Sequence, residues 1–198
     1  MDTDANDARR KWNRVYAGTS TEPARACLAL ETFSYLLPTS GRALDVACGR
    51  GGNALLLAQQ GLNTSALDIS PVALNTLASQ AQACGVAIEL IEADTAEYCA
   101  SEVEQFDVIV VSNYLDRDFC WRLPQLLAPG GLLFYQTFVK DKAEPGKGPS
   151  NPDFLLDAGE LLKLFGALRV LQYVDLGSIG DVSHGLRNQA MLVALQEN

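Results

Sequence analysis

The sequence predicts an α/β domain in which mostly parallel strands are joined by crossover helices. Two observations indicate this fold class. Short runs rich in β-branched and aromatic residues alternate with longer segments of helical periodicity. The first strand-like run also ends in LDVACGRGG, where glycines follow an acid, as expected where a parallel strand turns into a helix. With 198 residues, the chain is long enough for one domain with a buried core.

The glycine turn follows a predicted helix and the first predicted strand, and it leads into a second helix. A helix is expected from Glu22-Pro23 to Leu37, because proline fits the first helical turn. The run ALDVA at 43–47 is the first strand. Apolar residues at helical spacing then predict a helix over 51–60.

The next segment repeats this alternation. The run NTSALDI at 63–69 is the second strand. Ser70-Pro71 supplies a hydroxyl cap followed by proline at the first helical position, which predicts a helix that continues to Ala83. The run VAIELIEA at 86–93 is the third strand.

The fourth and fifth strands are the most apolar part of the chain. The run FDVIVVSN at 106–113 is typical of a central strand that is covered on both faces. A helix is expected over 117–127. The turn Pro129-Gly130-Gly131 then leads into the fifth strand at 132–139.

An irregular segment separates the fifth strand from the last two. Residues 140–156 are rich in proline and glycine, so we expect a surface excursion. Asp157 and Glu160 have capping-box spacing ahead of a short helix. The runs at 170–176 and 190–196 are the sixth and seventh strands. No helix fits between them, so we expect them to pair antiparallel.

Acids end three successive predicted strands. Asp45 precedes the glycines, Asp68 ends the second strand and Asp94 follows the third. Ligands of open α/β sheets collect at this edge, where glycine lets the backbone approach them closely. A carboxylate suits ribose hydroxyls or an adenine amino group and attracts a cation. The pattern therefore favours a positively charged nucleoside without phosphate.

The glycine turn by itself also fits a second ligand. Gly49, Gly51 and Ala54 satisfy the G-x-G-x-x-G/A fingerprint of dinucleotide-binding proteins. A nicotinamide-dependent reductase is therefore one alternative function. A non-catalytic domain that keeps the cofactor fold as a scaffold is the other.

The motifs in their order resemble those of class I S-adenosylmethionine-dependent methyltransferases. The resemblance includes LDVACGRGG, ALDIS, EADTAEY, FDVIVVSNYL and LLAPGGLLFYQTF, and it extends from Trp12 to Ala194. It implies a three-layer Rossmann-like sandwich around a seven-stranded, mostly parallel sheet with strand order 3-2-1-4-5-7-6 and strand 7 antiparallel. It also implies S-adenosyl-L-methionine as the cofactor, and hence an enzyme.

Two further stretches resemble a narrower group. WNRVYAG near the start and GPSNPDFLLDAGELLKLF with LRVLQY are similar to bacterial tellurite-resistance and thiopurine-methyltransferase-like proteins. This resemblance implies a small-molecule acceptor, for example a thiol or a chalcogen oxyanion. The class I family uses a segment ahead of the fold core to cover the cofactor, so residues 1–21 are expected to cover the cofactor site and 22–198 to form one domain. Residues 140–156 are expected to act as a lid, because this segment is irregular and leaves the fifth strand at the ligand edge.

The resemblance and the strand ends together select the candidate site residues. Trp12 and Tyr16 lie four residues apart, on one face of any N-terminal helix, where aromatic rings attract a sulfonium. The expected cofactor-binding residues are Trp12, Tyr16, Asp45, Ala47, Cys48, Gly49, Gly51, Asn53, Asp68, Ile69, Ser70, Asp94, Thr95, Ser112, Asn113 and Leu115.

The candidate catalytic residues are Tyr114, His184 and Arg187. Tyr114 follows the fourth strand, near the expected position of the reacting methyl, although it also suits packing under a helix. His184 is the only histidine, and in the alternative interpretation it is a solvated loop residue. An ionised acceptor needs no general base, whereas a neutral hydroxyl or amine needs one, and His184 is then the candidate.

The charge and the cysteine content bear on the substrate class and on the cellular location. The formal net charge is −9 and no basic stripe is present, which argues against a nucleic-acid substrate. No apolar run is long enough for a membrane span, no secretory signal is visible and no metal-ligand spacing occurs, so a cytoplasmic location is expected. Most of the five cysteines lie among apolar residues and are expected to be small buried residues of a reducing compartment, and Cys48 also lies inside the glycine motif. The five are Cys27, Cys48, Cys84, Cys99 and Cys120.

Overall fold

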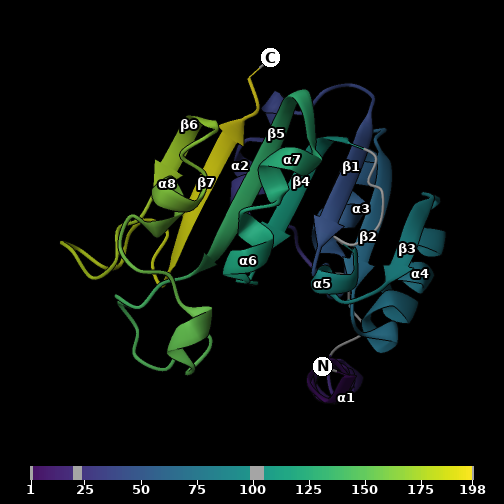
Figure 1. Cartoon of the computed structure of the whole chain (residues 1–198), viewed down its shortest axis with the longest axis horizontal. Coiled ribbons are helices and arrows are strands. Elements are labelled where there is room, and N and C mark those ends of the chain that lie inside the picture. Colours follow the sequence, from purple (N-terminus) through teal and green to yellow (C-terminus); the bar gives the residue numbers. More distant parts are fainter. Residues whose placement is uncertain (1, 20–23, 99–104, 198) are drawn as a thin grey trace.

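The computed structural model describes residues 2–19, 24–98 and 105–197, with the side chains of the first helix described from residue 6 onward. The described residues form one seven-stranded sheet in the order β3-β2-β1-β4-β5-β7-β6 (Figure 1). Strand β7 runs antiparallel to both of its neighbours. The predicted fold class, strand order and reversed strand are therefore confirmed.

The strands agree with their predicted ranges to within a few residues. They are β1 (Arg42–Val46), β2 (Asn63–Asp68), β3 (Ile88–Glu92), β4 (Phe106–Ser112), β5 (Leu127–Phe138), β6 (Arg169–Val174) and β7 (Gln189–Leu195). Strand β5 begins before the predicted glycine turn, and its register with β4 shifts between Phe106 and Val108.

The described helices are α1 (Asp2–Ala17), α2 (Leu28–Thr32), α3 (Gly52–Gln59), α4 (Pro71–Cys84), α5 (Thr95–Tyr98), α6 (Arg117–Cys120), α7 (Leu123–Leu126) and α8 (Glu160–Leu164). Helix α4 agrees with its predicted range, whereas the helices predicted over 22–37, 51–60 and 117–127 are shorter or divided in the structure. Two short 3₁₀ turns, η1 (Ser34–Leu36) and η2 (Pro152–Phe154), complete the described elements.

Two predicted helices are corrected. The start expected at 22–23 lies outside the described residues, and 24–27 are not helical, so the helix begins at Leu28 and gives way to a 3₁₀ turn after Phe33. The helix expected over 117–127 is two single turns, because Pro124 at the start of α7 cannot continue the hydrogen bonds of α6.

The sheet is covered on both faces (Figure 1). Along β5, Leu133 and Tyr135 pack with the α6, α7 and α8 side, whereas Leu132 and Phe134 pack with the α2 side. Helix α4 covers β2 through a third cluster that contains Ala66 and Leu77. Successive side chains of a central strand therefore alternate between two buried layers, as the uninterrupted apolar runs require.

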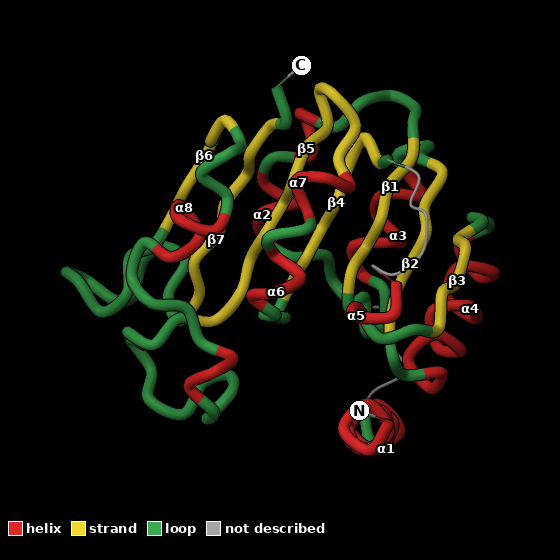
Figure 2. Tube along the Cα trace, viewed as in Figure 1, coloured by secondary structure: helices red, strands yellow, loops and turns green. Residues whose placement is uncertain are grey.

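The segment after β5 forms a closed excursion. Val139 bridges Leu156, the Lys140 N–H donates to the Leu156 carbonyl at 2.9 Å, and the Leu156 N–H donates to the Phe138 carbonyl at 2.9 Å. Residues 140–155 therefore leave and return to the sheet at one point. Figure 2 shows this excursion as loop with one short helical turn, below the carboxyl end of β5.

In the part of the chain that the structure describes, no helix has the length and apolarity of a membrane span. Of the described cysteines, Cys27, Cys48 and Cys120 are buried thiols. Cys84 is exposed at the end of α4, and Cys99 lies outside the described residues.

Candidate active site

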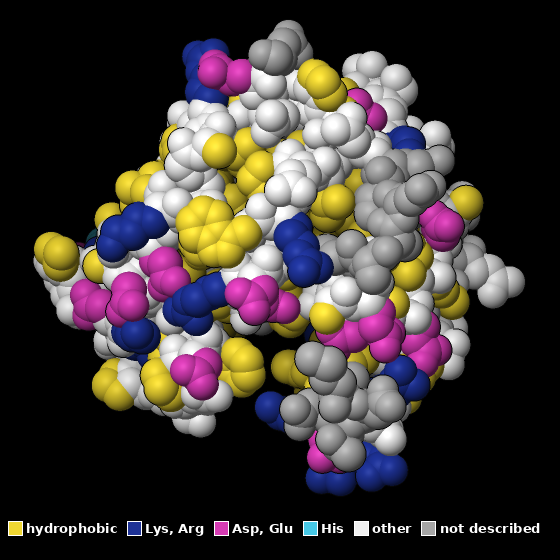
Figure 3. All heavy atoms as spheres, viewed as in Figure 1, with side chains coloured by type: hydrophobic (Ala, Val, Ile, Leu, Met, Phe, Trp, Pro, Cys, Tyr) yellow, Lys and Arg dark blue, Asp and Glu magenta, His cyan; other side chains and the backbone are white. Residues whose placement is uncertain are grey.

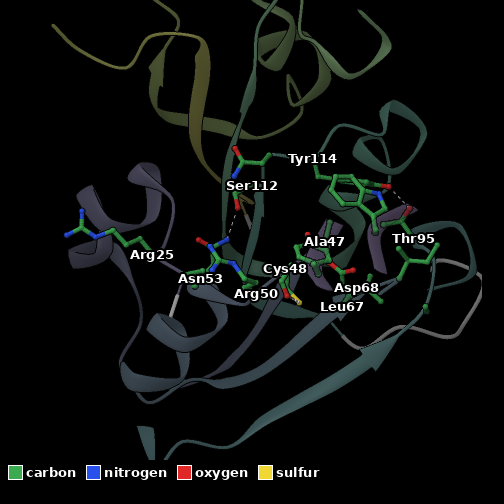
Figure 4. A pocket seen from close by; sticks show the side chains of 18 residues that line it. Arg25, Ala47, Cys48, Arg50, Asn53, Leu67, Asp68, Thr95, Ser112 and Tyr114 are labelled. Carbon is green, nitrogen blue, oxygen red and sulfur yellow. Dashed lines mark hydrogen bonds between the residues drawn. The ribbon is translucent and has the colours of Figure 1, made fainter. Parts of the chain in front are cut away.

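A pocket of about 350 Å³ lies at the carboxyl ends of β1, β2 and β4, where neighbouring connections diverge to opposite faces of the sheet (Figure 4). Its walls come from α1, from the segment before α2 and from the tips of these strands. The lining residues are Trp12, Tyr16, Ala24, Arg25, Ala47, Cys48, Gly49, Arg50, Gly52, Asn53, Leu67, Asp68, Ile69, Ala93, Thr95, Ser112, Asn113 and Tyr114.

The glycine turn after β1 forms the floor of the pocket. Ala47, Gly49 and Gly51 all have positive φ, at 50°, 53° and 76°. The Gly51 N–H donates to the Cys48 carbonyl at 2.8 Å, which closes the turn. A Cβ at Gly49 would lie 2.7 Å from the Tyr16 hydroxyl oxygen, so glycine there lets α1 close onto the turn.

The start of α3 contacts the segment before α2. A Cβ on Gly52 would lie 2.3 Å from the Arg25 carbonyl oxygen, so only glycine allows this approach. The Cys27 N–H donates to Asn53 Oδ1 at 2.8 Å, and Asn53 Nδ2 donates to Ser112 Oγ at 2.9 Å. Figure 4 marks the second bond, which links α3 to the tip of β4.

Asp68 presents its carboxylate to the pocket from the end of β2. It is 5% exposed, and its two oxygens accept from the Gly49 and Ser70 N–H groups, each at 2.8 Å. Burial raises the pKa of Asp68, and these backbone hydrogen bonds oppose that rise. Each oxygen keeps a further lone pair, so the carboxylate can still accept hydrogen bonds from a ligand.

Asp45 lies beneath the pocket and does not line it. It is fully buried and accepts from Asn53 Nδ2 and the Ala54 N–H, each at 3.1 Å. Burial raises the pKa of Asp45 to about 7, against the effect of these two donors. The carboxyl group therefore orients Asn53 and the first turn of α3.

A hydroxyl network forms the opposite wall. Thr95 Oγ1 lies 2.9 Å from the Tyr114 hydroxyl oxygen and donates to Asp116 Oδ2 at 3.2 Å. Asp116 also caps α6 through its other oxygen. Burial is the main cause of a Tyr114 pKa well above its ordinary value. The Tyr114 ring is therefore held in the wall as a neutral phenol (Figure 4).

Helix α1 brings its aromatic pair to the pocket, as the four-residue spacing predicts. The Trp12 and Tyr16 rings stack with centroids 5.8 Å apart. Burial, followed by the nearby Asp68 charge, raises the pKa of the Tyr16 phenol well above its ordinary value. Lys11 Nζ lies 5.8 Å from the Phe154 ring centroid, so α1 also meets the 140–155 excursion. Figure 3 shows the surface hollowed between these two parts.

Some of the predicted site residues support the pocket from outside. Gly51 fits against the Leu77 side chain, and Ser70 caps α4 by accepting from the Ala73 N–H at 3.3 Å. Asp94 accepts from the Ala96 N–H at 3.0 Å, and Leu115 is buried in the core. With Asp45, these residues shape the turns that carry the lining residues.

The structure does not bring His184 or Arg187 to the pocket, which corrects the expectation that their loop delivers them there. The His184 side chain is 82% exposed and pairs with Asp181, with Nδ1 2.9 Å from Oδ2. The Arg187 guanidinium donates to carbonyls of its own loop, including Ile179 at 2.7 Å and Asp181 at 2.8 Å. Arg187 therefore folds the loop on itself.

Several lining residues were absent from the sequence-based set. Gly52 and Arg50 belong to the glycine turn, so the motif itself was a signal for them. Leu67 and Ala93 are strand-end neighbours of predicted residues. Nothing in the sequence around Ala24 and Arg25 indicates a site, because a contact with the distant Gly52 brings them to the pocket. The Arg25 guanidinium points away from the pocket in Figure 4.

Comparison with known proteins agrees with this geometry. Residues 43–131 match the family model described as a methyltransferase domain. This part of the chain is similar to methyltransferase domains, and the sheet has the strand order expected for the class I methyltransferase fold. The matched range includes the glycine turn, Asp68 and the tip of β4, so the glycine motif lies in the part of the chain that is similar to methyltransferases.

Relatives and solved structures extend the similarity. A ubiquinone biosynthesis O-methyltransferase from Salmonella arizonae is 28% identical over 119 residues, which are 55% of this chain and 49% of that protein. The chain therefore spans about half the length of the curated relatives that it matches.

Two solved structures share the fold over nearly the whole chain. TehB from Haemophilus influenzae superposes with a TM-score of 0.69 at 18% identity, covering 94% of this chain and 67% of that one. A structure from work on the conversion of a disulfide bond into a thioacetal group during echinomycin biosynthesis gives 0.70 at 22% identity, covering 96% and 92%.

Proposed function

We propose that this protein transfers a methyl group from S-adenosylmethionine to a small-molecule nucleophile that arrives already ionised, a thiol or a chalcogen oxyanion. One observation carries the choice of acceptor: the described pocket wall offers no group suited to remove a proton near neutral pH. The site geometry and the methyltransferase domain support the cofactor.

The acid–base groups of the wall support this choice. Tyr16 and Tyr114 have pKa values raised above that of free tyrosine, and burial raises the pKa of the Cys48 thiol well above its ordinary value. The free lone pairs of Asp68 are assigned to the ribose hydroxyls of the cofactor, and His184 is not among the lining residues. A general base needs to be within reach and unprotonated, so the acceptor has to supply its own charge.

The residues present suit the cofactor. Asp68 has lone pairs free to accept ribose hydroxyls. We propose that the adenine lies against Thr95, which lines the pocket and donates to Asp94 Oδ1 at 3.4 Å. Trp12 and Tyr16 provide aromatic faces that attract a sulfonium. When bound, S-adenosylmethionine supplies an electrophilic methyl group on that sulfonium.

The chain then has two tasks, to align the acceptor and to exclude water. The neutral Tyr114 and Thr95 hydroxyls form one wall, and the tip of β4 forms the next. We propose that α1 caps the cofactor and that 140–156 is a lid, since Lys11 of α1 already reaches Phe154. A closed, dry pocket favours reaction of an anion with a cation, because their charges cancel as the methyl moves.

The curated relative's name offers a second acceptor class, a hydroxyl group. A phenol or catechol is a weaker nucleophile until it loses its proton. The described wall lacks a group to take that proton near neutral pH, so the site favours sulfur and chalcogen acceptors over oxygen ones.

The test is release of S-adenosylhomocysteine from S-adenosylmethionine with benzenethiol, 2-mercaptoethanol, selenite and tellurite, beside catechol and aniline. We expect turnover of the first group. The pH at which kcat/KM levels off should follow the pKa of the acceptor thiol. It should therefore be lower for benzenethiol than for 2-mercaptoethanol, which is the more basic thiol. A shared midpoint for both thiols, or turnover of catechol alone, would contradict the proposal.

A binding variant separates the cofactor assignment from the acceptor assignment. Asp68→Asn should weaken S-adenosylhomocysteine binding by roughly 10–100-fold, because hydrogen bonds to a charged group contribute about 1.5–3 kcal/mol. Calorimetry measures this, with exposed Asp118→Asn as the control. Tight cofactor binding without turnover of any acceptor would favour the scaffold alternative.

A further inference from the structure

Two series of hydrogen bonds through side-chain amides end at the tip of β4, one at Asn113 and one at Ser112. The first runs from the Ala29 N–H to Gln136 Oε1 at 2.8 Å, and from Gln136 Nε2 to Gln189 Oε1 at 2.7 Å. Gln189 Nε2 then donates to Asn113 Oδ1. These residues lie far apart in sequence, and the buried Gln136 joins them through the centre of the sheet.

The direction of this relay is fixed at its inner end. A side-chain amide can be turned end for end, so only its partners decide which atom points where. A backbone N–H can only donate, so Gln136 must turn its oxygen toward Ala29 and its nitrogen toward Gln189. Gln189 must then turn its oxygen toward Gln136 Nε2, so its nitrogen donates to Asn113 Oδ1. Asn113 must therefore keep its oxygen inward, which leaves Nδ2 for the pocket that it lines.

The second relay ends one residue away with the same polarity. The Cys27 N–H fixes Asn53 Oδ1, so Asn53 Nδ2 donates to Ser112 Oγ at 2.9 Å and to Asp45. Ser112 accepts this bond and keeps its own hydroxyl proton for another partner. Within the described residues, no hydrogen bond uses the Ser112 proton or Asn113 Nδ2.

The backbone at Asn113 supports a functional role for this arrangement. Asn113 has φ of 56°, in the left-handed region where asparagine is enriched among residues other than glycine. Its own N–H donates to the Gln136 carbonyl at 2.8 Å, so backbone and side chain are both tied to the same strand pair. The result is an exposed amide with little freedom to turn.

We infer that Asn113 is a specificity-determining residue, held by Gln136 and Gln189 so that it and Ser112 present hydrogen-bond donors to the methyl acceptor. The acceptor class that fits is a nucleophile with a hydrogen-bond acceptor, such as a carbonyl or carboxylate oxygen, adjacent to the atom that is methylated. This inference rests on the proposed function.

The decisive variant is Gln189→Glu. A carboxylate at this position still accepts from Gln136 Nε2 but has no proton for Asn113 Oδ1. Asn113 should then turn its nitrogen inward and present oxygen to the pocket. Gln189→Met removes the hydrogen bond to Asn113 and leaves the Asn113 amide free to adopt either orientation. Gln172→Glu, an exposed site on the neighbouring β6, makes the same charge change away from the pocket and is the matched control.

The probes are two thiols with uncharged ortho substituents, methyl 2-mercaptobenzoate with an acceptor oxygen and 2-aminobenzenethiol with a donor. The unmodified protein and Gln172→Glu should prefer the ester in kcat/KM by about 10-fold, the effect of one hydrogen bond. Gln189→Glu should reverse the preference, and Gln189→Met should reduce it to about 2-fold or less. An unchanged preference in Gln189→Glu, or none in the unmodified protein, overturns the inference.

A second readout does not depend on turnover. In the S-adenosylhomocysteine complex, methyl 2-mercaptobenzoate should shift the Asn113 side-chain ¹⁵N–H signals, assigned by their loss in Asn113→Asp, and should not do so in Gln189→Glu. If no thiol is methylated but these shifts occur, the proposed function fails and the donor assignment stands. If Gln189→Glu instead weakens S-adenosylhomocysteine binding 10-fold or more, the donors recognise the cofactor, and the acceptor assignment is overturned.

Discussion

Asp45, Asn53 and Asp68 show how single residues prepare this site before any ligand binds. Each is a polar side chain that is at most 5% exposed, and each is hydrogen-bonded to backbone or to a polar neighbour. Burying such groups is costly unless they are satisfied. The partners therefore fix the side chains and also fix the turns that surround the pocket.

A substitution at Gly51 tests how closely the glycine turn fits against Leu77. Gly51→Ala should lower the free energy of unfolding by about 2–4 kcal/mol, because φ of 76° is strained for alanine and the added Cβ would meet Leu77 at 2.2 Å. Gly85→Ala is the control: φ is 69° there, but nothing lies within 4 Å of the added atom. Urea unfolding should show a clearly smaller loss for Gly85→Ala, and equal losses would disprove the close fit at Leu77.

Asp45 gives a pH prediction. Its pKa is about 7 when folded and near 3.8 when unfolded, so the folded state holds the extra proton between these values. This residue's contribution to stability is therefore complete below about pH 4 and is lost as pH rises to about 7, by up to about 4 kcal/mol.

The comparison that isolates this effect is Asp45→Asn. The amide is not ionised, and its mismatch with Asn53 Nδ2 adds a cost that does not depend on pH. Relative to the unmodified protein, Asp45→Asn should gain stability as pH rises from 5 to 8, as measured by urea unfolding. A constant difference over this range would mean that Asp45 ionises normally in the folded protein.

At the scale of elements, Arg117 ties three segments together. From α6, its guanidinium pairs with Glu160 at the start of α8, with Nε 2.6 Å from Oε1, and also donates to the Asp153 and Leu155 carbonyls. Glu160 Oε2 in turn accepts from the Asp157 N–H at 2.7 Å, which is half of the predicted capping box. Arg117 is thus engaged in structure, and it fastens the end of the 140–155 excursion.

Arg117→Met should loosen this excursion. We expect a loss of about 1–3 kcal/mol in the free energy of unfolding, because a bidentate charged pair and two bonds to carbonyls disappear. Amide hydrogen exchange should accelerate at 151–157 more than elsewhere. Arg122→Met, at an exposed position in the next helix turn, should change neither quantity. Unchanged exchange at 151–157 in Arg117→Met would show that Arg117 does not fasten the segment.

At the scale of the whole molecule, the pocket joins parts that are remote in sequence, so cofactor binding should stabilise them together. A ligand that binds only the folded state adds about 2.7 kcal/mol at 100 times its Kd. For a chain of this size, S-adenosylhomocysteine at that excess should raise Tm by about 5–10 °C. NADH at equal concentration is the control. A shift with NADH and none with S-adenosylhomocysteine would restore the dinucleotide interpretation.

The sequence alone determined the strands, the glycine turn and the acids that end the strands. These features are local: apolar runs need two covering layers, and glycine is required where φ is positive or the backbone is crowded. Asp68 and the glycine turn could therefore be assigned to one edge before the fold was known, and family resemblance added the Trp12–Tyr16 pair. Family resemblance supplied the strand order, which local patterns do not contain.

Tertiary structure alone decided what the remaining polar groups do. His184 and Arg187 have the right chemistry for a catalytic site, but their loop bonds to itself and does not reach the pocket. Gln136 and Gln189 appear in the sequence as ordinary strand residues, yet they become the relay that orients Asn113. The physical reason is that hydrogen bonds between distant segments depend on which strands the sheet places side by side, and neither composition nor spacing records that.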